Sequence, residues 1–227
     1  MDAVVLDRIP FQIESRSLLP SLRMKQDGPQ AEDVEALLRE ARAIARPKAI
    51  YGVARVESIH GDSVVIEGVT FSSRILRVNL EQAHRVFPFV ATCGVEIEEW
   101  SRSVDGLLKR YFADTIKEAA LGSAIEALGR HLEETFRPGP TGMMNPGSLP
   151  DWATSQQKNL FALFGDVVAS IGVQLTGSCI MSPIKSVSGM LFPTETGFES
   201  CQLCPMKQCP KRRAPYDESL YEKKYRE

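Results

Sequence analysis

The order of apolar and polar positions predicts a helix and then a β-hairpin in the first third of the chain. Across residues 31–47 the apolar side chains recur at helical spacing, and Pro47 ends the run. Two runs rich in β-branched residues follow at 50–59 and 63–71. The short polar connection at 60–62 contains a glycine, which is typical of a hairpin turn.

The rest of the pattern predicts one buried strand, two helices and a pair of short strands. Residues 86–93 form an apolar run of strand length, and 105–136 repeat Ala and Leu at helical spacing. The Pro- and Gly-rich stretch 137–152 predicts a loop of the kind that often holds ligands. A helix over 154–171 and two strands within 173–192 complete the pattern.

These elements predict an α+β fold, with a twisted antiparallel sheet of about five strands that carries long helices on one face. The apolar periodicity stops after residue 192. We therefore expect an α+β domain over residues 1–192 and a cysteine-rich tail over 193–227, docked near the Pro-Gly loop.

Composition narrows the class of protein and its partners. The 227 residues are 43% hydrophobic and 25% charged, which is typical of a soluble globular protein. The 27 Lys and Arg nearly balance the 29 Asp and Glu, so no overall field attracts nucleic acid or an anionic membrane. The first residues lack the basic flank of a signal peptide, and no run reaches the length of a membrane span. We expect a cytoplasmic protein without nucleic-acid or membrane partners, and its oligomeric state stays open.

Three of the five cysteines, Cys201, Cys204 and Cys209, lie within nine positions of one another. Thiolates at this spacing can converge on an iron–sulfur cluster or on zinc. Pro follows both Cys204 and Cys209 and no histidine lies nearby, which favours iron–sulfur over zinc. Cys179 is the better candidate for a fourth ligand, whereas Cys93 is expected in the core. The alternative is that these cysteines are simple reactive or buried thiols.

A second motif spans NPGSLPDW and IGVQLTGSCIMSPIKSVSG, residues 145–152 and 171–189. Here the chain resembles the activation domain of vitamin B12-dependent methionine synthase, which has a Pro-Gly turn, a helix and an L-T-x-S-x-x-M-x-P-x-x-S-V-S-G strand. The resemblance extends over residues 1–192. The matching residues are Pro146, Gly147, Leu175, Thr176, Ser178, Met181, Pro183, Ser186, Val187, Ser188 and Gly189.

The resemblance implies the function of this family, in which the domain binds S-adenosylmethionine and covers a corrinoid while its cobalt(II) is reduced and remethylated. It also implies that the loop at 143–152 and the serine-containing strand at 181–189 face the corrinoid of a partner protein. The implied groove residues are Pro146, Gly147, Ser148, Asp151, Met181, Ser182, Pro183, Lys185, Ser186, Ser188 and Gly189.

Three positions depart from the family pattern. Met143 and Ser148 stand where the family's R-x-x-P-G-Y motif has Arg and Tyr, and Ser123 stands where an acidic residue is expected on the long helix. An Arg that pairs with a carboxylate orients its ligand strongly, and Met offers no such contact. We therefore expect weak or absent binding of S-adenosylmethionine.

The leading hypothesis is an accessory protein for a corrinoid-dependent methyltransferase, whose cysteine centre supplies or relays an electron. The first alternative is a subunit that binds S-adenosylmethionine and contributes directly to methyl transfer. The second is a zinc-stapled interaction module without catalysis.

Overall fold

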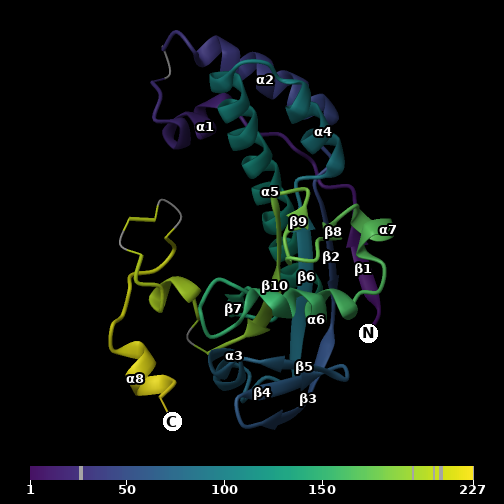
Figure 1. Cartoon of the computed structure of the whole chain (residues 1–227), viewed down its shortest axis with the longest axis vertical. Coiled ribbons are helices and arrows are strands. Elements are labelled where there is room, and N and C mark those ends of the chain that lie inside the picture. The colour runs from purple at the N-terminus through teal and green to yellow at the C-terminus, as the bar shows by residue number, and fades with distance from the viewer. Residues whose placement is uncertain (26–27, 196, 207, 210–211, 227) are drawn as a thin grey trace.

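The computed structural model of the chain describes residues 1–25, 28–195, 197–206, 208–209 and 212–226. In this part of the chain eight strands form one antiparallel sheet, drawn in the lower half of Figure 1. The strands are β1 (Ala3–Leu6), β2 (Lys48–Gly52), β3 (Ala54–His60), β4 (Ser63–Ile66), β5 (Val69–Ser72), β6 (Arg85–Thr92), β7 (Thr141–Met144) and β10 (Ser186–Pro193).

Strand β6 lies at the centre of the sheet. One of its edges pairs with β2 and β3 in succession, and the other pairs with β10, which in turn pairs with β7. Neither β2 nor β3 pairs with Phe87 or Pro88, because the β2 pairing ends opposite Phe89 and the β3 pairing begins opposite Val86. Proline has no amide hydrogen, so the change from β2 to β3 falls where a ladder hydrogen bond would be missing.

The helices cover the sheet and extend beyond it. Helix α5 is the longest, and its middle and C-terminal turns pack on one face of the sheet (Figure 1). The helices are α1 (Ser15–Leu22), α2 (Ala31–Ile44), α3 (Arg74–Asn79), α4 (Val95–Ser103), α5 (Leu107–Phe136), α6 (Gln157–Ala162), α7 (Val167–Ile171) and α8 (Leu220–Lys224), with 3-10 turns η1 (Thr154–Gln156) and η2 (Ser200–Gln202).

Alternation along the strands divides the core between the two faces of the sheet. Tyr51 and Phe89 face α5, where they meet Leu128. Ile50 and Val90 point to the opposite face, into a cluster that includes α6 and α7. A third cluster joins α1, α2 and α4 to the first half of α5, above the sheet in Figure 1. The α+β class, the antiparallel sheet and a long helix on one of its faces are therefore confirmed. The sheet has eight strands where about five were expected, and the short helices α6 and α7 cover its other face.

Most predicted elements are present, with four differences. The hairpin turn at 60–62 is confirmed, but the run 50–59 is divided between β2 and β3 and the run 63–71 between β4 and β5. The helix at 31–44, the strand at 85–92 and the helix at 107–136 are confirmed. The loop at 137–152 contains β7, which the sequence analysis missed. The helix predicted over 154–171 is broken into η1, α6 and α7, with Gly165 at φ 72° between the last two. Of the two strands predicted within 173–192, the first is reduced to β8 (Gln174–Leu175) and β9 (Met181–Ser182), which form a small hairpin.

The segment after residue 192 is attached to the core by aromatic side chains. Phe198 is 4% exposed and Tyr225 is fully buried, and both belong to the cluster beneath α6 and α7. The Tyr225 hydroxyl donates to Asn79 Oδ1 over 2.9 Å, and Arg74 Nε donates to the Tyr225 carbonyl. The order of this segment therefore comes in part from burial of these aromatic side chains, without the metal centre predicted at its cysteines.

The pH dependence of this attachment follows from Tyr225. Burial raises its pKa to about 12, while the hydrogen bond with Asn79 opposes the shift. The unfolded side chain ionises near pH 10, so the folded state holds more protons between these values and stability falls as pH rises through that window. We expect the free energy of unfolding, measured by urea denaturation at each pH with circular dichroism, to fall by up to about 3 kcal/mol between pH 10 and 12. Tyr225→Phe should flatten this dependence; an unchanged profile would contradict the assignment.

Candidate functional site

The two motif segments meet where the Pro-Gly loop crosses strand β10. Asn145 Nδ2 donates to the Ser188 carbonyl over 2.8 Å. A Cβ at Gly189 would overlap Asn145 Nδ2 and the Met144 carbonyl, so only glycine lets the loop approach this closely. The structure therefore brings the two predicted segments into contact; that they form a binding groove stays a prediction.

The loop itself is a tight turn. Gly147 has φ 85° and its N–H donates to the Trp152 carbonyl over 2.7 Å, while the Ser148 N–H donates to the Asn145 carbonyl over 3.1 Å. Pro146 is buried and Gly147 and Ser148 are exposed. The turn thus presents Gly147 and Ser148 to solvent at the end of the β7 strand.

Asp151 attaches the far end of the loop to helix α3. Its carboxylate accepts from the backbone N–H groups of Ile75 (3.0 Å) and Arg74 (3.3 Å) and from the Ser73 hydroxyl. The two N–H groups belong to the first helical turn, where they have no partner within the helix, and Ser73 is the residue before that turn. Asp151 was predicted to line a groove, and the structure gives its carboxylate this capping role.

The segment before β10 carries two apolar side chains that the sequence analysis did not select. Ile180 is 57% exposed and Ile184 is 63% exposed, on either side of the β9 strand and Pro183. Met181 is half-buried, Ser182 is exposed, and Pro183 is buried after a cis peptide bond. Both isoleucines lie within the motif quoted from the sequence. That they are exposed, however, can be seen only in the fold.

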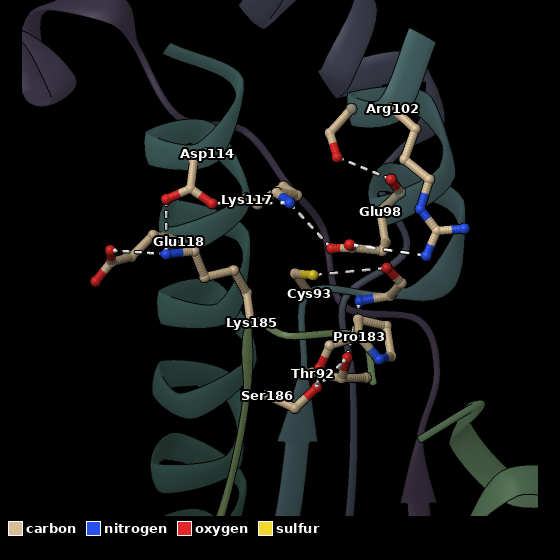
Figure 2. Close-up of polar contacts among 12 residues, drawn as sticks. Thr92, Cys93, Glu98, Arg102, Asp114, Lys117, Glu118, Pro183, Lys185 and Ser186 are labelled. Atoms are coloured by element: carbon tan, nitrogen blue, oxygen red, sulfur yellow. Dashed lines mark hydrogen bonds and ion pairs between the residues drawn. The ribbon is translucent and has the colours of Figure 1, made fainter. Parts of the chain in front are cut away.

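Lys185 connects this segment to the long helix. Its Nζ lies 2.8 Å from Asp114 Oδ2 and 3.6 Å from Glu118 Oε2 on α5 (Figure 2). Both carboxylates line a groove of about 740 Å³ between α5 and residues 9–21. The structure places the Lys185 ammonium group against these acids, and its predicted role at a corrinoid stays a prediction.

A second lysine makes a more buried ion pair beside the first. Lys117, 7% exposed, lies 3.0 Å from Glu98 and 3.7 Å from Asp114, and so joins α4 to α5 (Figure 2). Cys93 lies nearby, and burial raises the pKa of its thiol to about 12, with a smaller contribution from Glu98. Cys93 is fully buried, as predicted for a core cysteine.

Ser186 and Ser188 have different surroundings on β10. Ser186 Oγ lies 2.9 Å from Thr92 Oγ1 and 2.8 Å from the Pro183 carbonyl oxygen, which joins the cis-proline turn to the end of β6. Ser188 is 2% exposed, and its Oγ has no hydrogen-bond partner among the described residues; the same holds for Trp152 Nε1. A buried polar atom without a partner costs about 1–3 kcal/mol, and such atoms are found at functional sites.

The structure does not bring three of the cysteines together. In the ranges that the structure describes, no three His, Cys, Asp or Glu side chains form a group that could hold a metal ion. Cys179 is buried, with its Sγ 3.9 Å from the Ser155 carbonyl oxygen in η1, whereas Cys201, Cys204 and Cys209 are half-buried on the tail. The arrangement therefore gives no support to a single centre built from Cys179 and the three tail cysteines, whether iron–sulfur or zinc.

The close approach at Gly189 generates a stability prediction. Gly189→Ala must displace Asn145, the Met144 backbone or the Phe89 ring, so we expect a loss of about 1–3 kcal/mol in the free energy of unfolding. Gly122→Ala is the matched control, because an added Cβ on α5 meets no atom within 4 Å, and it should stabilise the protein by up to about 1 kcal/mol. Urea denaturation measures both; equal effects of the two substitutions would contradict the steric argument.

Comparison with known proteins agrees with this architecture. No family model and no curated protein matches the chain. A crystal structure of the MetH reactivation domain bound to AdoHcy matches with a TM-score of 0.65 and 14% sequence identity, over 85% of this chain and 78% of that chain. In the described residues no helix is long and apolar enough to cross a membrane. The fold expected from the resemblance is confirmed: the chain has the fold of the MetH reactivation domain.

Proposed function

We propose that this protein is an accessory protein for a corrinoid-dependent methyltransferase such as methionine synthase, and that it supports reactivation of a corrinoid carried by that partner. The observation that carries the proposal is the shared fold with the MetH reactivation domain, in a chain whose motif residues meet at one place, the crossing of the Pro-Gly loop and β10. Fold alone does not define function, so the rest of the argument comes from the exposed residues of the segment that leads into β10.

The proposed contact surface is the β8–β9 hairpin and the turn that follows it. Ile180 and Ile184 are both more than half exposed. Large apolar side chains gathered on a protein surface mark sites of contact with a partner or ligand. The turn is rigid, because Ser186 joins it to Thr92 and Lys185 joins it to Asp114. A rigid apolar surface loses little conformational entropy when a partner covers it.

The proposal assigns no electron transfer to the tail cysteines. A cluster or zinc ion requires converging thiolates, and no such group exists in the described part of the chain. When bound in the partner, the corrinoid supplies the cobalt chemistry. The residues of this chain would position the partner, exclude water from it and hold the Pro-Gly loop against it.

The test measures recovery of an inactivated corrinoid enzyme. A methionine synthase that lacks its own reactivation domain is oxidised to the cobalt(II) state and then supplied with reductant, with the methyl donor and methyl acceptor for which it retains sites, and with this protein. We expect faster recovery of methyl transfer with the protein than without it. We expect Ile184→Asp to reduce this gain about tenfold or more, equivalent to about 1.4 kcal/mol.

Leu107→Asp is the matched control. Leu107 is 89% exposed at the start of α5, about two helical turns before Asp114, and it is not part of the proposed surface, so the same change of chemistry should leave the gain unaltered. If neither the unmodified protein nor its variants alter recovery with cognate corrinoid proteins, the proposed function is wrong.

The second candidate is a subunit that binds S-adenosylmethionine, because the matching MetH structure holds AdoHcy. In this chain Met143 lies on β7 and packs against the cluster between the sheet and α5. Its side chain is uncharged, so it cannot replace the family's Arg. We expect calorimetry with S-adenosylmethionine to give no binding at micromolar concentrations. Micromolar affinity would show that other residues replace the absent Arg and Tyr, and would favour this second candidate.

A further inference from the structure

The tail holds a pair of cysteines in a turn. Cys201 lies in η2, and the Cys204 N–H donates to the Cys201 carbonyl over 3.3 Å. A turn with this hydrogen bond holds its first and fourth Cα atoms within about 7 Å. Disulfides join Cα atoms about 4.4–6.8 Å apart, so this turn is compatible with a bond between the two sulfurs.

One arginine braces the turn from the C-terminal side. Arg212 Nη1 donates to the Cys201 carbonyl over 2.8 Å, and Nη2 donates to the Cys204 carbonyl over 2.9 Å. The same guanidinium donates to the carbonyls of Met206 and Ala214. Because a planar guanidinium presents its donors in a fixed geometry, it holds the two cysteine backbones together.

The two thiols differ in their surroundings. Cys204, like Leu203, packs against the core cluster that includes α6 and α7. Cys201 does not belong to that cluster, and its Sγ accepts the Arg213 N–H at 3.5 Å. Cys93 and Cys179, by contrast, are buried. Cys201 is therefore the thiol of the pair that an external reagent meets first, with Cys204 behind it.

We propose that Cys201 and Cys204 form a redox-active dithiol that exchanges with external disulfides such as glutathione disulfide. The Cys201 sulfur, having released its proton, bonds to one sulfur of the external disulfide and expels the other as a thiol. The Cys204 sulfur then bonds to the Cys201 sulfur and expels the second thiol. The protein loses two protons and two electrons, and the external disulfide gains them to become two thiols. This proposal does not rest on the corrinoid function.

The position of Lys207 makes a direct test possible. Trypsin cleaves after Lys185, Lys207 and Lys211, so Cys201 and Cys204 share one peptide while Cys209 is on another. The reduced full-length protein is incubated with glutathione disulfide, the remaining thiols are alkylated, and the digest is analysed by mass spectrometry. We expect a disulfide within the peptide of Cys201 and Cys204, with Cys93 unmodified in the folded protein.

Matched variants separate the roles of the three tail cysteines. Cys209→Ser should leave the internal disulfide intact, whereas Cys204→Ser should leave Cys201 as a mixed disulfide with glutathione. Arg212→Ala should lower the equilibrium constant for the internal disulfide about tenfold, or about 30 mV. Circular dichroism establishes that each variant is folded.

Three results would overturn the proposal. The first is a disulfide that links the peptides of Cys204 and Cys209 in place of the internal one. The second is an absence of any disulfide at glutathione ratios that oxidise exposed dithiols. The third is anaerobically purified protein that contains stoichiometric iron or zinc and resists alkylation until a chelator removes the metal, which would restore the metal centre predicted from the cysteine spacing.

Discussion

The arrangement of this molecule depends on the need of one buried strand for hydrogen-bond partners. Every residue of β6 after Arg85 is buried, so its backbone groups cannot be satisfied by water. Strands β2 and β3 satisfy one edge and β10 the other. The pairing with β10 brings the motif residues 186–189 to the centre of the sheet. Ser186 and its partner Thr92 are more than 90 residues apart in the sequence.

The candidate site is a consequence of this pairing. Once β10 lies against β6, the strand β7 can pair with its far edge, and the loop after β7 must cross β10 at Gly189. The same placement carries Lys185 to the acids of α5. Both halves of the motif are therefore held by contacts with the sheet and the long helix, and the exposed Ile184 lies in the turn between these contacts.

The sequence was sufficient to predict the elements with strong periodicity. It was insufficient for features that depend on contacts between residues far apart in the chain. The pattern predicted α2, β6 and α5 because each buries a regular stripe. It missed β7, which is only four residues long among prolines and glycines and is stabilised by pairing with β10. The partners of Lys185 and Asp151 lie on α5 and α3, dozens of residues away, and no local pattern encodes them.

The cysteine-rich tail also shows where sequence patterns are insufficient. Here the pattern predicted a metal centre that the structure does not support. Spacing alone indicates soft ligands, but it does not specify how the loop is held. Burial of Tyr225 and the contacts of Arg212 with the Cys201 and Cys204 carbonyls supply order without a metal. A dithiol exchanges electrons in pairs, whereas reduction of cobalt(II) requires one electron. The proposed thiol chemistry of the tail therefore cannot by itself replace the external reductant, and it is better suited to report or alter the redox state of this protein than to reduce a corrinoid.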